Sequence, residues 1–433
     1  MATRKPSASS DTRPAMTGSA IDDMVLAAQV RGGESFETGR YVMTFKEGAL
    51  DDAVKGMAAQ GLRVADARDF ENQAMAIEDV GDADSMVFPE VGAMVITGEA
   101  FQERGMSAQA EIAADSPVEA IEPEYFAFAD GASEQYLQGF MRAAETIARD
   151  LGRYPPEPEE EELEAQVLGV TWGLARCKVP PSVRSGAGIR VAVLDTGMDI
   201  AHPDFAGRLV TAQSFVGQPV QDLHSHGTHC IGTACGPKAP PGTTPRYGIG
   251  FKTHIFVGKV LTNSGSGTTA SVLAGMNWAI ANRCAVISMS LGSQSPVQSA
   301  YTAAGQAALN RGCLIVAAAG NIGRATGAPA NSPTIMAVAS LDPTLAPSSF
   351  SNFGKIEIAA PGRDVFSSVP RPTRYGVKTG TSMATPHVAG CAALWAETSP
   401  ALRGQALWSR LLATARPLPH PPARVGKGLV QAP

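Results

Sequence analysis

The amino-acid sequence predicts an α/β protein in which a mostly parallel sheet flanked by helices follows a small α+β domain. Three observations predict this class. From about residue 166, short continuous apolar runs alternate with helical stretches. Before that point, segments with strand and helix patterns follow the order β-α-β-β-α-β. The block PPEPEEEELE (155–164) separates these two halves, and 433 residues are enough for more than one domain.

Residues 1–37 predict a disordered segment. They begin MATRKPSASSDTRPAMTGSA, which is polar, rich in Ser, Thr and Pro, and without the apolar stretch of a secretory signal. We therefore expect a cytoplasmic protein by default, with unconventional secretion left open as the alternative.

Residues 38–130 predict a compact α+β domain with the order of elements of a ferredoxin-like fold. Its segments show either the alternation of a strand or the three- and four-residue apolar spacing of a helix. In chain order, we expect a strand at 41–48 (YVMTFKEG), a helix at 49–61 (ALDDAVKGMAAQG), strand residues at 85–98 (SMVFPEVGAMVITG), a helix at 99–115 and a final strand at 117–130 (PVEAIEPEYFAFAD).

Residues 131–165 predict a helix followed by a linker. Apolar residues such as Tyr136, Phe140 and Ile147 recur on one helical face, which we expect to pack on a neighbouring domain. The Pro- and Glu-rich block after them predicts a solvated spacer, or alternatively a segment that a protease can reach.

Residues 166–433 predict the parallel sheet. Continuous apolar runs are typical of strands that are buried on both faces, and the helical stretch 271–283 (SVLAGMNWAIANR) lies between two of them. The runs are IRVAVLD (189–195), HIFVGKVL (254–261), CAVISMSLG (284–292) and GCLIVAAAG (312–320). Functional groups in such sheets gather at the carboxyl ends of the strands.

Composition argues against several classes of protein. A net charge of −6 gives no basic surface for nucleic acid, and no apolar run approaches the roughly 18 residues of a membrane span. None of the six cysteines forms a CxxC pair, so we expect buried free thiols rather than a disulfide framework or a zinc site.

Three polar residues stand where chemistry would be placed. Asp195 ends the run VAVLD, His226 opens a short helix in HSHGTHCIGT (224–233), and Ser382 opens another in GTSMATPHVAG (380–390). Taken singly, each has an ordinary interpretation as a turn residue or a helix cap.

The histidine-rich stretch also permits a zinc interpretation. His224, His226 and His229 lie close to Asp222, but there is no HExxH motif and no downstream ligand at a familiar spacing. We therefore predict no metal site.

Together, the three stretches resemble the subtilisin-like serine peptidases (subtilases). The matching segments are VAVLDTGMDIAHPDF (191–205), HGTHCIGT (226–233) and GTSMATPHVAG (380–390), in the chain order Asp, His, Ser that distinguishes this arrangement from unrelated triads. The intervals between the three residues are 31 and 156 positions, and the resemblance covers about residues 166–433.

The resemblance implies a role for each matching residue. Asp195, His226 and Ser382 would form a catalytic triad, and Asn321 in AAAGN (317–321) would donate to the oxyanion. The segments SGSG (264–267) and MSLG (289–292) would flank a bound peptide. The implied substrate-binding residues are Gly265, Ser266, Gly267, Ser290, Leu291 and Gly292. No cofactor is required; calcium stays open as an alternative, although the segment 236–250 shows no calcium-ligand pattern.

The resemblance extends more weakly to residues 38–130, which are similar in length and element order to the inhibitor-type propeptide of this family. It implies a serine endopeptidase made as a self-processed zymogen, with polypeptide substrates, its own prodomain as inhibitor, and no nucleic-acid or membrane partner. The cut would fall near Asp130 or within 152–166. The alternatives are a peptide ligase or macrocyclase that uses the same triad, and an inactive binding pseudoprotease.

Overall fold

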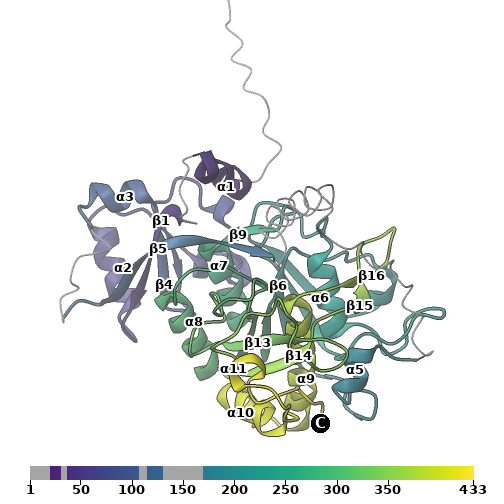
Figure 1. Ribbon diagram of the computed structural model, residues 1–433. Coiled ribbons are helices and arrows are strands. Elements are labelled where there is room, and N and C mark those ends of the chain that lie inside the picture. Colours follow the sequence, from purple (N-terminus) through teal and green to yellow (C-terminus); the bar gives the residue numbers. More distant parts are fainter. Residues whose placement is uncertain (1–19, 31–36, 107–114, 130–168) are drawn as a thin grey trace, which may run out of the picture.

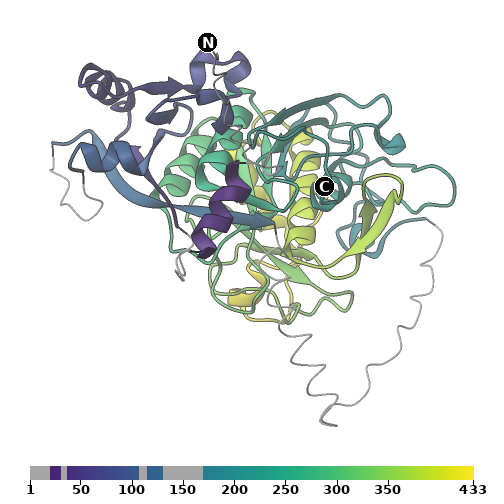
Figure 2. The same ribbon diagram turned by 90° about the horizontal axis from the view of Figure 1, so that it is seen from above.

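A computed structural model describes residues 20–30, 37–106, 115–129 and 169–433 (Figure 1). We call residues 37–106 and 115–129 the N-terminal body and residues 169–433 the C-terminal body. The N-terminal body lies against one side of the larger C-terminal body in both views (Figures 1 and 2).

The C-terminal body is built on a seven-stranded parallel sheet in the order β14-β13-β12-β10-β6-β8-β7. Its strands β6, β10 and β12 are the continuous apolar runs of the sequence, and their apolar side chains are fully buried. The predicted parallel sheet is therefore confirmed. The strands are β6 (Arg190–Asp195), β7 (Val210–Ser214), β8 (His254–Lys259), β10 (Val286–Met289), β12 (Leu314–Ala318), β13 (Met336–Leu341) and β14 (Ile358–Pro361).

Helices pack on both faces of this sheet, as the alternation of runs and helical stretches predicts. Two of them, α6 and α9, are apolar or small on every side and nearly all of their residues are buried. The helices are α5 (Trp172–Arg176), α6 (His226–Cys235), α7 (Thr269–Ala281), α8 (Ser299–Asn310), α9 (Thr381–Thr398), α10 (Gly404–Thr414) and α11 (Pro422–Val425), with a 3₁₀ turn at Pro203–Phe205; β15 (Val365–Ser368) and β16 (Tyr375–Lys378) form a separate hairpin.

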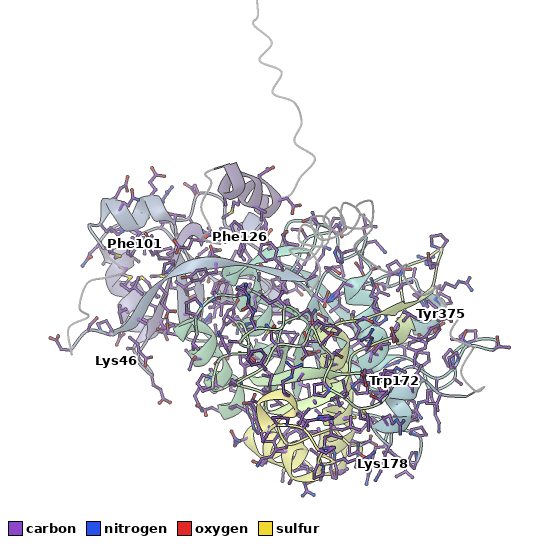
Figure 3. All side chains as sticks on the ribbon, in the orientation of Figure 1. Lys46, Phe101, Phe126, Trp172, Lys178 and Tyr375 are labelled. Atoms are coloured by element: carbon purple, nitrogen blue, oxygen red, sulfur yellow. The ribbon has the colours of Figure 1, made fainter. Side chains whose placement is uncertain are left out.

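The N-terminal body is a sheet in the order β5-β1-β4-β3-β2, with its own apolar core. Phe101 belongs to that core and stacks on Tyr41, with ring centroids 3.9 Å apart (Figure 3). The elements are β1 (Glu37–Phe45), α2 (Leu50–Ala59), β2 (Val64–Asp66), β3 (Ser85–Phe88), β4 (Ala93–Ile96), α3 (Gly98–Glu103) and β5 (Val118–Ala129), with 3₁₀ turns at Ala67–Asp69, Glu71–Gln73 and Ile77–Val80.

The structure adds detail that the sequence pattern did not predict. Strand β2 is three residues long and pairs with β3. A strand this short cannot show an alternation of apolar and polar residues in the sequence. Helix α3 ends at Glu103, whereas the sequence predicted a helix over 99–115; residues 107–114 lie outside the described residues. The predicted helix and linker at 131–165 lie entirely outside them too.

The prediction of disorder at residues 1–37 is wrong for one segment. Ala20–Val30 form helix α1, in which Ile21 is fully buried. The carboxylate of Asp22 accepts hydrogen bonds from the hydroxyls of Thr262 (2.9 Å) and Ser264 (2.5 Å) in the C-terminal body. A contact with a partner so distant in sequence leaves no local pattern, which is why the composition of the segment was misleading.

Strand β5 joins the two bodies. It runs from the N-terminal sheet onto the C-terminal body (Figure 1), where it pairs antiparallel with β9 (Ser266–Thr268) and β11 (Leu291–Gly292). Phe126, labelled in Figure 3, is 2% exposed at this crossing.

Two sequence-based expectations concern cysteines and membranes. All six cysteines are free and buried, which confirms the prediction of buried thiols. Among the helices that the structure describes, none combines the length and the apolar character that crossing a bilayer needs.

Candidate active site

The structure brings Asp195, His226 and Ser382 to one edge of the parallel sheet. Asp195 is the last residue of β6, which lies between β10 and β8 in the sheet. His226 is the first residue of α6, and Ser382 is the second residue of α9. The side chains are almost fully buried, with whole-residue exposures of 1%, 3% and 1%.

Asp195 and His226 form a buried pair. His226 Nδ1 lies 2.8 Å from Asp195 Oδ1 and 3.0 Å from Oδ2. Burial alone would raise the pKa of Asp195, but attraction to His226 and hydrogen bonds from His226 and the Thr196 N–H lower it below its ordinary value. Burial opposes a charged imidazole, yet the Asp195 carboxylate raises the pKa of His226 well above the ordinary value.

This geometry fixes the proton on His226. The carboxylate can only accept, so Nδ1 carries the N–H in either protonation state, and in the neutral imidazole Nε2 presents its lone pair. Within the described residues, Nε2 has no hydrogen-bond partner. The imidazole is therefore oriented as a base.

Ser382 is held next to Ser290. The Ser382 hydroxyl donates to the Ser290 carbonyl oxygen at 3.2 Å, and the Ser290 hydroxyl donates to the Ser382 carbonyl oxygen at 2.8 Å. Ser382 lies at the N-terminus of an 18-residue helix, where backbone N–H groups and the helix dipole favour developing negative charge.

Pro386 explains the unusual environment of the Ser382 carbonyl. Proline has no N–H, so the carbonyl four residues earlier, that of Ser382, receives no bond from it within α9. The Ser290 hydroxyl and the Cys230 thiol, the latter at 3.5 Å, donate to this carbonyl instead. Burial raises the pKa of Cys230, which keeps its thiol protonated as a weak donor.

Asn321 is oriented by the residue before Ser382. Its Oδ1 accepts from the Thr381 N–H at 2.8 Å and from the Thr381 hydroxyl at 2.9 Å. The Nδ2 group therefore points the other way, toward Gly380, where a side-chain carbon would come within 3.1 Å of it. The fixed amide offers its N–H donors beside Ser382.

The six predicted substrate-binding residues flank the end of β5. Phe128 and Ala127 of β5 face Ser266 and Gly267, while Phe128 and Ala129 face Gly292 and Leu291. Gly265 accepts a hydrogen bond from the Ala129 N–H at 2.8 Å, and Ser290 directly precedes β11. A polypeptide strand thus fills the groove between β9 and β11.

Two carboxylates fasten β5 to helices of the C-terminal body. The Glu124 side chain is fully buried and accepts from the Ala270 N–H at 2.8 Å, in the first turn of α7. Glu122 accepts from the Ser299 N–H at 2.8 Å, at the start of α8. Sequence analysis missed both, although acidic residues in a strand that alternates with apolar ones were a signal that could have found them.

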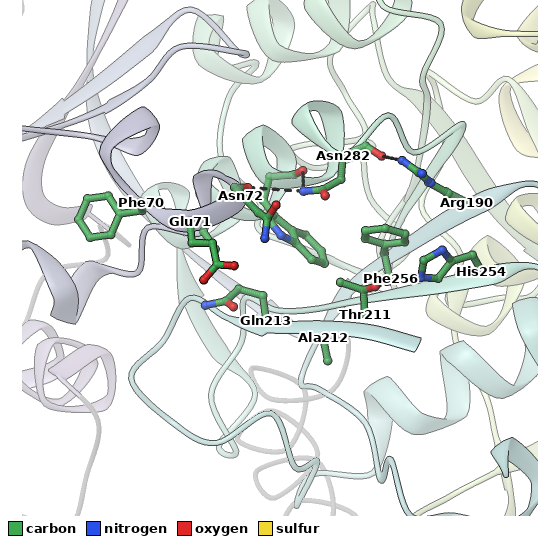
Figure 4. Close-up of a pocket in the computed structure, with 12 residues that line it drawn as sticks. Phe70, Glu71, Asn72, Arg190, Thr211, Ala212, Gln213, His254, Phe256 and Asn282 are labelled. Atoms are coloured by element: carbon green, nitrogen blue, oxygen red, sulfur yellow. Dashed lines mark hydrogen bonds between the residues drawn. The ribbon is translucent and has the colours of Figure 1, made fainter. Parts of the chain in front are cut away.

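A hollow of about 520 Å³ lies elsewhere on the interface between the bodies (Figure 4). The 3₁₀ turn at 71–73, the strands β7 and β8, and α7 surround it. Asn282 bridges the two bodies by donating to the Asn72 carbonyl at 3.5 Å, and its own carbonyl accepts from Arg190 at 2.7 Å. None of the residues that line the hollow belongs to the Asp195–His226–Ser382 group.

The zinc interpretation of the histidine stretch is not supported by its hydrogen bonds. His229 Nε2 lies 2.9 Å from the Val365 carbonyl oxygen, and both oxygens of Asp222 already accept hydrogen bonds. In the part of the chain that the structure describes, the cluster of metal-type ligand atoms is Asp195, His226 and Cys230, which includes the buried pair itself.

Comparison with known proteins points to one family. The profile of the subtilase family matches residues 186–428. The alkaline protease of Alkalihalobacillus alcalophilus is 38% identical over 281 residues, which are 63% of this chain and 72% of that protein. Subtilisin Savinase of Lederbergia lenta is 39% identical over 270 residues, 61% of this chain and 97% of that protein.

Further similarity is found in sequence and in structure. Thermitase of Thermoactinomyces vulgaris is 41% identical over 218 residues, 49% of this chain and 77% of that protein. The crystal structure of a cold adapted subtilisin-like serine proteinase superposes with a TM-score of 0.53 at 31% identity, over 61% of this chain and 97% of that one.

Proposed function

Since the chain belongs to the subtilase family and is a serine endopeptidase, we propose that it is made as a zymogen that cuts itself. Asp195, His226 and Ser382 form its catalytic triad, and Asn321 is the oxyanion donor. The N-terminal body is its prodomain and inhibitor. The observation that carries this proposal is the strand β5, which lies in the groove beside Ser382 as an extended peptide.

The chemistry follows from the positions of these groups. Ser382 Oγ attacks the carbonyl carbon of the peptide bond while its proton passes to His226 Nε2. The carbonyl oxygen becomes an oxyanion, which the Ser382 N–H and the Asn321 amide stabilise. His226 then gives the proton to the departing amine. Water, deprotonated by the same imidazole, releases the acyl group from Ser382.

Polypeptide substrates would be held by their backbones. The groove pairs with β5 through main-chain hydrogen bonds on both sides, which is strand addition and needs no particular side chain. We infer that residues 265–267 and 290–292 hold an unfolded segment or a flexible loop in the same way. No cofactor takes part in this scheme.

The register of β5 also indicates where the precursor is cut. Gly292 faces Phe128 and Leu291 faces Ala129, the last residue of β5, and Ser290 directly precedes Leu291. The Ser290 carbonyl accepts from Ser382 Oγ, so the C-terminal end of β5 lies on the side of the groove that holds the nucleophile. We therefore propose cleavage of the Asp130–Gly131 bond rather than within 152–166.

The proposal is tested by comparing the purified wild type with Ser382→Ala. On a denaturing gel, the wild type should lose a prodomain-sized fragment and the variant should remain full length. A fluorophosphonate probe should label the wild type and not the variant. Ser349→Ala, at an exposed serine, is the matched control and should behave as the wild type.

The same experiment separates the alternatives. An inactive binding protein would stay full length and unlabelled in both forms, which contradicts the proposal. A ligase or macrocyclase would be labelled, but peptide substrates would yield joined or cyclic products by mass spectrometry instead of hydrolysed ones.

A further inference from the structure

Asp222 is a fully buried carboxylate that the triad chemistry does not use. Its Oδ1 accepts from the N–H groups of His224 (2.9 Å) and Ser225 (2.8 Å) and from the Thr196 hydroxyl (3.0 Å). Its Oδ2 accepts from the N–H (2.9 Å) and hydroxyl (2.7 Å) of Thr228. With donors on both oxygens, no site is left for a proton, so Asp222 is an anion.

These hydrogen bonds join the two segments that carry Asp195 and His226. Thr196 follows Asp195 directly, while Ser225 and Thr228 bracket His226 at the start of α6. The Thr196 hydroxyl also accepts from the Gly227 N–H at 2.9 Å, which directs its own hydrogen to Asp222. One carboxylate therefore fixes both ends of the Asp195–His226 pair.

Ser225 shows how strongly Asp222 shapes this turn. Its φ of 77° lies in the left-handed region that favours glycine. The Ser225 N–H bond to Asp222 holds the backbone in this conformation, so that His226 begins the helix facing Asp195.

Lys259 is the buried cation of the same layer. It ends β8, opposite Asp195 in the sheet, and is fully buried. Its ammonium group donates to the Thr196 carbonyl and, at 2.9 Å, to Asn263 Oδ1. Burial lowers the pKa of Lys259 to about 8, while Asp222 and Asp195 act against that shift. The group therefore remains mostly charged at neutral pH.

We propose that Asp222 and Lys259 are positioning residues for the Asp195–His226 pair, and that their opposite charges set the pH at which His226 gains its proton. While His226 is neutral, the buried layer holds two anions, Asp195 and Asp222, and one cation, Lys259. When His226 takes the proton of Ser382, the layer becomes neutral. Asp222 thus favours the charged imidazole that the reaction requires, and Lys259 limits this effect.

Other groups also face His226 and remain in place throughout the comparison. They are Asp195 on β6, His224 in the preceding loop, and His229 and Cys230 on α6 itself, with Lys378 of β16 acting on both His224 and His229 and the Ser382 carbonyl of α9 bound to Cys230. Neither Asp222→Asn nor Lys259→Met removes a member of this set, and the opposite signs of the two expected shifts separate the effect of charge from a rearrangement of the loop that Asp222 holds.

The inference rests on the proposed function, and its test is the pH dependence of kcat/KM of the self-processed enzyme on a chromogenic peptide. Activity falls at low pH as His226 gains a proton, and we call this part of the kcat/KM profile the acid limb. Asp222→Asn removes an anion and should move the acid limb to lower pH. Lys259→Met removes a cation and should move it to higher pH. We expect shifts of about 0.5–1 pH unit, in opposite directions.

Two further variants separate charge from structure. Thr196→Val breaks the hydrogen-bond link without altering charge, so it should lower kcat/KM and leave the acid limb in place. Asp204→Asn, at a buried carboxylate that accepts from Tyr247 and Tyr375, is the matched control and should leave the acid limb unchanged. If Asp222→Asn does not fold, Lys259→Met still tests the proposal, because its acid limb should move to higher pH.

The inference is overturned if labelled, active Asp222→Asn and Lys259→Met enzymes keep the wild-type acid limb or shift it in the same direction. This outcome differs from a failure of the proposed function, in which the wild type itself would neither cut nor be labelled.

Discussion

The candidate active site and the interface around β5 both depend on carboxylates, but the donors to these carboxylates come from different parts of the molecule. In the active site, Asp195 and Asp222 accept from groups of the C-terminal body alone. At the interface, Glu122 and Glu124 of the N-terminal body accept from the first turns of α8 and α7 in the C-terminal body. The first arrangement is complete without the N-terminal body, whereas the second exists only while the bodies are joined.

This difference assigns separate tasks to the two regions. A catalytic geometry built within one body survives cleavage of the chain. If the N-terminal body leaves after the proposed cut, an interface that relies on carboxylates at helix N-termini would end, and α7 and α8 would lose the charges that complement their dipoles. Variants in one region should therefore alter the chemistry, and variants in the other should alter the docking.

The largest effect is expected at Asn321. Asn321→Ala removes one oxyanion donor and should lower kcat of the processed enzyme about 10²- to 10³-fold with little change in KM. Steady-state kinetics measure this. The control is Asn310→Ala, at an exposed asparagine on α8, which should match the wild type. An equal rise in KM without a loss of kcat would show that Asn321 only binds the substrate.

A smaller effect is expected at Glu124, and it should concern docking only. In the inactive Ser382→Ala chain, Glu124→Ala removes the carboxylate that bonds the Ala270 N–H and pairs with Arg40. Hydrogen exchange of β5 amides should then become about 10- to 100-fold faster, because a charged hydrogen bond is lost.

The matched control for Glu124 lies on the same strand. Glu119 is exposed, so Glu119→Ala should leave the exchange of β5 unchanged. If Glu124→Ala also fails to alter exchange, strand pairing alone holds β5 in the groove, and the carboxylates do not distinguish the two regions.

The smallest effect is a pH dependence of stability that belongs to the C-terminal body, since all seven histidines of the chain lie there. Burial lowers the pKa of His387 to about 4, below its ordinary value of 6.5. Between these two values, the unfolded chain binds a proton that the folded chain does not. His387 should therefore lower the free energy of unfolding by about 1.4 kcal/mol per pH unit as the pH drops, in addition to the contributions of the other histidines.

Denaturant unfolding of the Ser382→Ala chain at pH 7, 6 and 5 measures this slope. In His387→Gln, the slope of the free energy of unfolding against pH should be smaller by about 1.4 kcal/mol per pH unit. His420→Gln, at a partly exposed histidine, is the control and should have the wild-type slope. An unchanged slope in His387→Gln would mean that this histidine is not held neutral by burial.

The two regions also differ in how far the sequence could predict them. Asp195, His226, Ser382 and Asn321 stand in short motifs whose order and intervals resemble those of the subtilases, so the resemblance was enough to expect their convergence. The N-terminal body was expected to act as an inhibitor only by its similarity in length and element order to the propeptide of the family, and the position of β5 in the groove came from the structure. The carboxylates of β5 were missed, because their partners lie more than 140 residues away in the sequence.

The same reason explains the other omissions. Asp222 was considered only as a zinc ligand, since its five hydrogen bonds come from segments that the sequence does not mark as neighbours. Lys259 appeared as one polar residue in the buried run HIFVGKVL. Helix α1 was hidden by a polar composition, because its anchoring residues Ile21 and Asp22 contact distant parts of the chain.

The central claim is that the enzyme acts on its own strand β5 from a site complete within the C-terminal body. The most direct test is the intact mass and N-terminal sequence of the larger fragment after the wild-type chain is purified. We predict a fragment that begins at Gly131 and is absent from Ser382→Ala. A fragment that begins within 152–166, or the same cut in Ser382→Ala, would contradict the account.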